Sequence, residues 1–195
     1  MAIVTALRAR GAQVAVELDG RAWRTLSVAV VVEAGLATGQ TIGREQARTL
    51  ARVLRRERAD ALAVRALARR ERSRTELDER LARAGVREED RRKTIERATR
   101  ARLLDDARYA EMRARLVAAR GVGDQLVLDD LARHGVDEAL AREAVARLEP
   151  EAARAAAVIE ARGRSARTLR RLVSRGFSEE SLEQLIAELE NGALR

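Results

Sequence analysis

The sequence LARHGV at residues 131–136 recurs as LARAGV at 81–86 and as LVSRGF at 172–177. All three stretches share the pattern L-x-x-x-G-[VF], which is typical of a helix that ends in a Schellman motif. In this motif a glycine with positive φ follows the helix, and the apolar residue after it folds back onto the leucine. The expected contacts are Leu81 with Val86, Leu131 with Val136, and Leu172 with Phe177. The sequence therefore predicts an internal repeat of similar helix ends.

Capping residues indicate that a short helix precedes each of these glycines and that another helix follows it. The expected N-caps are Ser73 (in a capping box with Glu76), Asp124, Asp137, Ser165 and Ser178. One further helix is expected before each of these pairs, so each repeat contains three helices. The predicted three-helix repeats span residues 59–104, 105–149 and 150–195.

The N-terminal part of the chain has a different pattern. Asp19-Gly20 lies between two runs of strand character, and Asp-Gly favours a type I′ hairpin turn because both central residues need positive φ. A short helix over residues 28–34 should follow and end at Gly35. We assign residues 1–43 to a β-hairpin region with this short helix, and residues 44–58 to a basic linking helix.

The composition indicates a mainly helical protein with a thin core. Hydrophobic residues make up 46% of the chain, but aromatic residues only 2%, and much of the apolar fraction is alanine, which buries little area. The predicted fold is mainly α: three tandem three-helix repeats in an elongated, curved array, preceded by a small N-terminal β-hairpin region. Such an array has no internal symmetry, which favours a monomer.

Several classes of protein are excluded or disfavoured. The chain has no cysteine, so it forms neither disulfides nor thiolate metal sites. The longest apolar run, Val28–Val32, is far shorter than the ~20 residues of a membrane span. Arg8 interrupts the N-terminal apolar stretch too early for a signal peptide. We therefore expect a cytoplasmic protein without a membrane contact.

The adjacent acids of LLDDARYA, residues 103–110, are expected to begin a helix. Carboxylates are favoured at a helix N-terminus by its free N–H groups, whereas a metal site would need further ligands that the sequence does not supply. Tyr109, Met112 and Leu116 should then form the buried stripe of this helix. The pair Asp129-Asp130 is expected on a solvated helix face.

No enzymatic apparatus can be recognised. The single histidine, His134, comes directly before a helix-ending glycine, where a cation has a structural role. There is no Gly-Lys pair of a Walker A loop, and GVG at 121–123 is too short for a dinucleotide fingerprint. We expect no catalytic residues, no metal and no cofactor.

The charge is unevenly distributed along the chain. The net charge of +8 divides into +10 for residues 1–104, −3 for 105–149 and +1 for 150–195. Because arginine binds phosphate through two parallel hydrogen bonds, basic helix faces favour a polyanion contact, although such a face is often merely solvated. The candidate contacts are Arg44, Arg48, Arg52, Arg55, Arg70, Arg72, Arg74, Arg91, Arg92, Lys93, Arg97, Arg164, Arg167, Arg170 and Arg171.

Several of these segments together resemble the RecX family of bacterial recombination regulators. The resemblance rests on the N-terminal hairpin, RSRTEL at 72–77, LLDDARYA at 103–110, and GVG with LDDLARHGV within 121–136. It covers about residues 10–190 and is most specific in L-D-D-x-R-[FY]-A. It implies a DNA-repair protein of homologous recombination and the SOS response, which binds the RecA filament and inhibits its growth, ATP hydrolysis and strand exchange.

The positions that match the family motifs are expected to keep the fold. They are Ser73, Glu76, Leu77, Leu104, Asp105, Asp106, Arg108 and Tyr109, with Gly85, Gly135 and Gly176 of the repeat. Arg72 also matches the first motif. One departure is that Asp124, Leu126 and Leu128 stand where the family often has a proline and two basic residues. This departure argues against a DNA contact from the middle repeat and agrees with its charge of −3. We expect the polyanion contacts on the first and third repeats and on the arginine-striped helix at 44–56, with the acidic middle repeat available to a basic protein surface.

Two other functions are compatible with the residues alone. The first is a stand-alone DNA-binding protein of helix-turn-helix-like modules, with residues 91–102 as the reading helix. The second is a helical scaffold without a DNA role. Since aromatic residues are nearly absent, base stacking is not expected, and contacts to single- or double-stranded DNA should be to its backbone and insensitive to sequence.

Overall fold

The computed structural model describes residues 1–192, so the last three residues of the predicted third repeat, 193–195, lie outside the described part. The chain forms two compact units. The first unit comprises residues 1–65 and 81–96, and the second comprises residues 66–80 and those from 97 onward.

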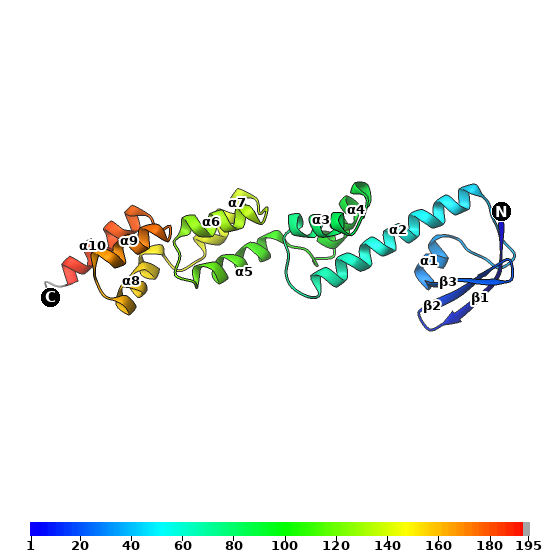
Figure 1. Cartoon of the computed structure of the whole chain (residues 1–195), viewed down its shortest axis with the longest axis horizontal. Helices are drawn as coiled ribbons and strands as arrows, with labels where there is room; N and C mark the ends of the chain where they lie inside the picture. The colour runs from blue at the N-terminus through cyan, green and yellow to red at the C-terminus, as the bar shows by residue number, and fades with distance from the viewer. Residues whose placement is uncertain (193–195) are drawn as a thin grey trace. The chain divides into compact units, whose positions relative to one another are not determined.

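The first unit contains a four-stranded antiparallel sheet with the strand order β3-β2-β1-β4. Strands β1, β2 and β3 are labelled in Figure 1. The strands are β1 (Ala2–Arg10), β2 (Gln13–Leu18), β3 (Arg21–Ser27) and β4 (Thr41–Ile42). Asp19 and Gly20 have φ of 49° and 75°, which confirms the predicted turn between β2 and β3. The short strand β4, which pairs with Ala2 and Ile3, has no counterpart in the sequence prediction.

Two helices contribute to the core on one face of this sheet. Helix α1 (Val28–Glu33) has Ser27 as its N-cap, and the chain turns at Gly35 with φ of 61°, as predicted. Helix α2 (Arg44–Leu67) begins where the basic linking helix was expected and continues without a break past residue 58. The shared core is formed by buried residues of the strands and of both helices, including Val4, Val16, Leu26, Val30, Leu50 and Val53.

The three repeated stretches end their helices as the sequence predicts. These helices are α3 (Arg74–Arg83), α6 (Asp124–Arg133) and α9 (Ala166–Ser174). In each case the residue after the glycine donates its N–H to the leucine carbonyl, at 3.1 Å for Val86, 3.1 Å for Val136 and 3.2 Å for Phe177. The glycines Gly85, Gly135 and Gly176 all have positive φ. The helices that follow are α4 (Glu88–Arg100), α7 (Glu138–Ala146) and α10 (Glu179–Gly192).

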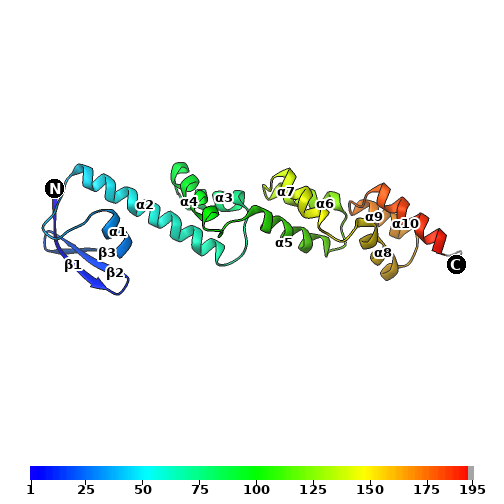
Figure 2. The ribbon, with the colours of Figure 1, turned by 180° about the vertical axis from the view of Figure 1, so that it is seen from behind.

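Helix α5 (Asp106–Ala118) packs with α6 and α7 around one core in the second unit (Figures 1 and 2). Tyr109 is buried in this core, as predicted, but Met112 and Leu116 are 39% and 50% exposed. The predicted stripe is therefore wrong at these two positions. The inner face of α5 is formed instead by small residues, Ala110, Ala114, Val117 and Ala118, which let the neighbouring helices approach closely.

Asp130 on α6 also departs from the prediction. Asp130 is only 8% exposed. The guanidinium of Arg113 donates to both of its carboxylate oxygens, at 2.6 and 3.0 Å. This bond to Arg113 outweighs the opposing effect of burial and lowers the pKa of Asp130. The expectation of a solvated carboxylate is therefore wrong for Asp130.

Helix α8 (Glu151–Arg162) forms a second helical group with α9 and α10, as both ribbon views show (Figures 1 and 2). Its core contains Ile159, Leu172 and Phe177. Ser165 caps α9 and Ser178 accepts the N–H of Ser181 at the start of α10, as predicted. At α6, however, the N-cap is Gly123 and not Asp124, whose side chain pairs with Arg154 instead.

Candidate nucleic-acid interface

The adjacent acids at the start of α5 are used for structure. Asp105 is the N-cap of α5 and accepts the N–H of Arg108 at 3.0 Å, which confirms the predicted helix start. Asp106 accepts the N–H of Arg74 at 2.7 Å. Among the described residues, no group of three or more histidine, cysteine, aspartate or glutamate side chains could hold a metal ion. Nor is any helix in residues 1–192 long and apolar enough to cross a membrane.

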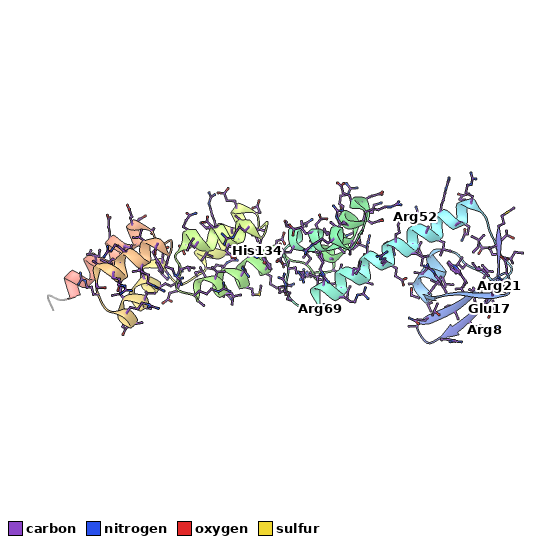
Figure 3. All side chains as sticks on the ribbon, in the orientation of Figure 1. Arg8, Glu17, Arg21, Arg52, Arg69 and His134 are labelled. Carbon is purple, nitrogen blue, oxygen red and sulfur yellow. The ribbon has the colours of Figure 1, made fainter. Side chains whose placement is uncertain are left out.

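The basic face of α2 consists of three free arginines and one paired arginine. Arg44, Arg48 and Arg52 are exposed, and their side chains make no hydrogen bond or ion pair with any residue that the structure describes. Arg52 is labelled in Figure 3. Arg55 is half-buried and lies 3.6 Å from the carboxylate of Asp90. The first three can therefore meet an external anion without breaking an internal contact.

The candidate cluster at residues 70–74 is occupied by the protein's own acceptors. Arg70 binds both carboxylate oxygens of Glu76 at 3.0 Å. Arg72 donates to the carbonyl of Ala66 at 3.2 Å. Arg74 lies 3.9 Å from Asp106. These side chains hold the start of α3 in place, and a phosphate would have to compete with these contacts.

The cluster on α4 is similarly divided. Lys93 pairs with Glu89 one turn earlier, and Arg91 donates to the carbonyl of Val86 at 3.3 Å. Arg97 is half-buried and has an interaction partner within the protein. Arg92 alone among these four candidates is exposed without a hydrogen bond or ion pair to a described residue. Helix α4 therefore offers little free charge for reading a DNA groove.

The third cluster, on and before α9, is the most available one. Arg164, Arg167 and Arg171 are exposed, and their side chains form no hydrogen bond or ion pair within residues 1–192. Arg170 is also exposed, and its side chain donates only to the carbonyl of Ala166, in its own helix, at 3.3 Å. Four guanidinium groups within eight residues can approach a phosphate backbone together.

Sequence reasoning did not select several other arginines that the structure leaves available. These side chains are exposed and have no hydrogen bond or ion pair to the described part of the chain: Arg10, Arg21, Arg65, Arg69, Arg80, Arg87, Arg100, Arg102, Arg120 and Arg162. Arg21 and Arg69 are labelled in Figure 3. Arg69, Arg100, Arg102 and Arg162 lie within the arginine-rich stretches 68–74, 91–102 and 161–171. The other six lie outside these stretches, and no local pattern distinguishes them from solvated arginines.

The residues of the family motifs are placed as fold-keeping residues. Leu77, Leu104 and Tyr109 are buried, and burial raises the pKa of the Tyr109 hydroxyl. Ser73 Oγ accepts the N–H of Glu76 at 3.1 Å and donates to the carbonyl of His134 at 2.6 Å. Ser73 therefore caps α3 and also connects it to the end of α6. The Ser73 half of the predicted capping box is therefore formed. The other half is not, because the Glu76 carboxylate binds Arg70 and not the N–H of Ser73.

Arg108 connects the same region, since it binds the carboxylate of Glu71 at 3.0 Å. This contact raises the pKa of Arg108. The motif residues thus join the segment before α3 to the start of α5, which is a structural use of these side chains.

A buried glutamate fixes α8 and α10 against the start of α6. Glu151 is 9% exposed, and its carboxylate accepts the N–H of Asp124 at 2.6 Å and that of Ser178 at 3.1 Å. It also accepts the hydroxyl of Ser178 at 2.6 Å. Burial opposes the charge of Glu151, but these hydrogen bonds outweigh it and lower its pKa. One carboxylate therefore binds N–H groups at the starts of two helices.

The same joint contains a close backbone approach. The N–H of Gly123 donates to the carbonyl of Arg175 at 2.9 Å, and Arg175 Nε donates to the carbonyl of Gly121 at 3.2 Å. A Cβ atom on Gly123 would lie 2.1 Å from the carbonyl oxygen of Gly176. We call the contacts of Gly123, Glu151 and Arg175 the α6–α10 joint. It fixes the position of the α9 arginines relative to α5–α7.

Comparison with known proteins identifies relatives that all carry the same family name. The family model described as RecX, second three-helix domain, matches residues 105–145. A protein named Regulatory protein RecX from Acidithiobacillus ferrooxidans is 34% identical over 145 residues, which cover 67% of this chain and 91% of the relative. Its namesake from Chromohalobacter salexigens is 35% identical over 134 residues, covering 64% of this chain and 88% of the relative.

Two solved structures have a similar fold. The crystal structure of a regulatory protein RecX has a TM-score of 0.79 at 18% identity, and the comparison covers 96% of this chain and 100% of that one. RecX from Lactobacillus salivarius has a TM-score of 0.62 at 20% identity, covering 70% of this chain and 97% of that one. The mainly helical fold with a small N-terminal strand region is thereby confirmed. The division into repeats and the contact residues stay predictions.

Proposed function

This chain belongs to the RecX family of regulatory proteins, and on that premise we propose that it binds the RecA recombinase and its DNA filament and inhibits filament growth, ATP hydrolysis and strand exchange. The observation that carries the proposal is the 34% identity to a Regulatory protein RecX over 91% of that relative's length. On this proposal the protein is a non-enzymatic, cytoplasmic regulator of homologous recombination, DNA repair and the SOS response.

The arrangement of charge supports a contact with the DNA backbone. The available arginines lie on α2 (Arg44, Arg48 and Arg52) and on or before α9 (Arg164, Arg167 and Arg171), where they are exposed. The chain has only one tryptophan, one tyrosine and one phenylalanine, and Tyr109 and Phe177 are buried. Trp23 is 37% exposed, but a single exposed ring does not form a row of stacking platforms. Arginine therefore suits phosphate contacts that position the protein without reading sequence.

The proposal predicts an effect on the recombinase itself. Adding the protein to RecA on single-stranded DNA should lower the rate of ATP hydrolysis at a molar ratio well below one, because one bound molecule would stop the growth of a filament of many subunits. The measurement is a coupled ATPase assay over a protein titration, with electron microscopy of filament length. An unchanged rate at equimolar protein would contradict the proposal.

The DNA contact has a separate prediction. Affinity for duplex DNA should be weak and indifferent to sequence, and log affinity should fall with log salt by roughly 0.9 per neutralised phosphate. Replacing Arg167 and Arg171 together with alanine should reduce this slope by about 1 to 2, because the variant neutralises fewer phosphates and so releases fewer counterions on binding. Fluorescence anisotropy at several salt concentrations measures the slope.

The matched control is Arg142→Ala, which removes an exposed arginine that pairs with Glu138 in the acidic middle stretch. It should leave the slope unchanged. Strong preference for a selected duplex over random ones would instead support the stand-alone DNA-binding protein. The internal partners of Arg91 and Lys93 on α4 argue against that alternative.

A further inference from the structure

The outer face of α5 exposes large apolar side chains. Met112 and Leu116 are 39% and 50% exposed, and Arg115 and Ala119 beside them are exposed as well. Positions 112, 115, 116 and 119 follow helical spacing, so they form one continuous face. Exposed single hydrophobic residues are common, but two adjacent ones beside a cavity indicate an interaction surface.

A cavity of ≈450 Å³ adjoins this face. Arg115, Ala118 and Ala119 at the end of α5 form one wall of it. Ala157, Val158 and Ala161 on α8 form the opposite wall, with Leu148 between α7 and α8. The volume lies within the range of small-molecule and side-chain binding sites, and the walls are mainly alanine, valine and leucine. The cavity therefore suits an apolar side chain.

The polar groups around the cavity are mainly basic. Three arginines line it, Arg115, Arg154 and Arg162, against the single acid Glu149. Arg154 is occupied, because it donates to the carbonyl of Val122 at 2.8 Å and pairs with Asp124. Arg162 is exposed and makes no hydrogen bond or ion pair with a described residue, and Arg115 has only Glu111, at 3.4 Å. The mouth can therefore accept a carboxylate.

We propose that this surface, which we call the α5–α8 groove (Met112, Arg115, Leu116, Ala119, Val158 and Arg162), docks a segment of the recombinase in which a large apolar side chain lies next to a carboxylate. This inference rests on the proposed function and names the part of the chain that contacts protein. The apolar side chain enters the alanine-lined cavity, Met112 and Leu116 beside the cavity contact the same segment, and the carboxylate binds Arg162 and Arg115. Methionine suits such a contact because its flexible side chain adapts to its partner.

A protein segment fits this groove better than DNA. Phosphate would use the arginines but would leave Met112, Leu116 and the apolar cavity without a partner. On this proposal the groove contacts protein, and the arginines of α2 and α9 contact DNA.

The test compares binding to the recombinase with binding to DNA. The double variant Met112→Ala/Leu116→Ala keeps the charge, so its anisotropy-measured affinity for DNA should not change. Its affinity for RecA without DNA, measured by biolayer interferometry, should fall roughly tenfold or more, as is typical of central apolar residues of an interface. Val173→Ala is the matched control, because Val173 is 54% exposed on α9 outside the groove. Arg162→Glu should also weaken RecA binding.

A photo-crosslinking amino acid at position 116 gives an independent readout on the full chain. It should crosslink to a recombinase peptide with aspartate or glutamate next to leucine, isoleucine or phenylalanine. Crosslinking to DNA, or to a segment without an acidic residue, would overturn the inference, as would normal RecA binding by the double variant. Those results would leave the proposed function standing. Failure of the unaltered chain to bind RecA would overturn both.

Discussion

Gly123→Ala should release α9 and α10 from the start of α6. Gly123 has φ of −78° and ψ of 173°, a conformation that any residue adopts, so backbone strain is not the reason for the glycine. The reason is space. An alanine Cβ would lie 2.1 Å from the carbonyl oxygen of Gly176 and 2.3 Å from the nitrogen of Phe177, and both are backbone atoms that no rotamer change can move.

The expected cost is about 3 kcal/mol or more of the free energy of unfolding for this part of the chain, the upper end for overpacking. This cost includes the loss of the hydrogen bond from Gly123 to Arg175 and of the hydrogen bonds that Glu151 accepts from Asp124 and Ser178. Hydrogen exchange of the amides of Asp124 and Ser178 measures the loss, because both donate to Glu151 and local opening of the joint exposes them. Thermal unfolding should begin at a lower temperature than in the unaltered protein.

The control is Gly43→Ala. Gly43 also lacks positive φ, and its added Cβ would meet nothing within 4 Å. Because its carbonyl accepts the N–H of Ala47 at the start of α2, the loss is limited to that of a weaker N-cap, about 1 kcal/mol or less. Equal protection of Ser178 in Gly123→Ala and in the unaltered protein would contradict the α6–α10 joint. If the α9 arginines act together with α5–α7 on a filament, Gly123→Ala should also weaken inhibition of RecA at unchanged net charge.

The second large effect is expected for Asp130→Asn. The change keeps the size of the side chain but leaves Arg113, whose side chain is 21% exposed, without its carboxylate. Breaking a buried pair by removing one partner costs about 3 kcal/mol or more, since the remaining charge stays in the interior without compensation. Chemical denaturation at neutral pH measures the loss.

The cost should depend on pH in a defined direction. Because Arg113 lowers the pKa of Asp130 in the folded protein, the stability from this pair is fully present above the unfolded pKa of about 4 and is lost as pH falls through the lower folded value. The difference between the unaltered protein and Asp130→Asn should therefore be largest near pH 7 and shrink below about pH 4.

Asp129→Asn provides the neighbouring control. The Asp129 carboxylate accepts a hydrogen bond from the Gln125 amide at 2.9 Å and is only half-buried, so its change should cost little. Equal losses for the two variants at pH 7 would show that burial of Asp130 does not matter. A loss for Asp130→Asn that stays constant from pH 7 to pH 3 would contradict the ion-pair explanation.

The sequence predicts which basic side chains are candidates for the interface, but not which of them are free of internal partners. The sequence alone identified fifteen basic side chains, yet Arg70 and Arg74 differ from Arg164 and Arg167 only in what lies beside them in space. Glu76 and Asp106 take up the first two, whereas the second two meet no described acceptor. The spacing of arginines along a helix indicates which face they occupy, but it does not indicate which acids from other segments reach them.

Local residue types are enough to predict where the chain turns. The Asp19-Gly20 hairpin, the Ser165 cap and the three glycine stops all depend on backbone φ and on hydrogen bonds between residues at most five apart, so local residue type decides them. Local residue types do not predict that Met112 and Leu116 are exposed, that Asp130 is buried or that Gly123 has no room for a side chain. Asp130 and Gly123 depend on residues far away in the chain, Arg113 and Gly176. Helix α5 has apolar residues on more than one side, so it can bury either face until neighbouring helices pack against one of them.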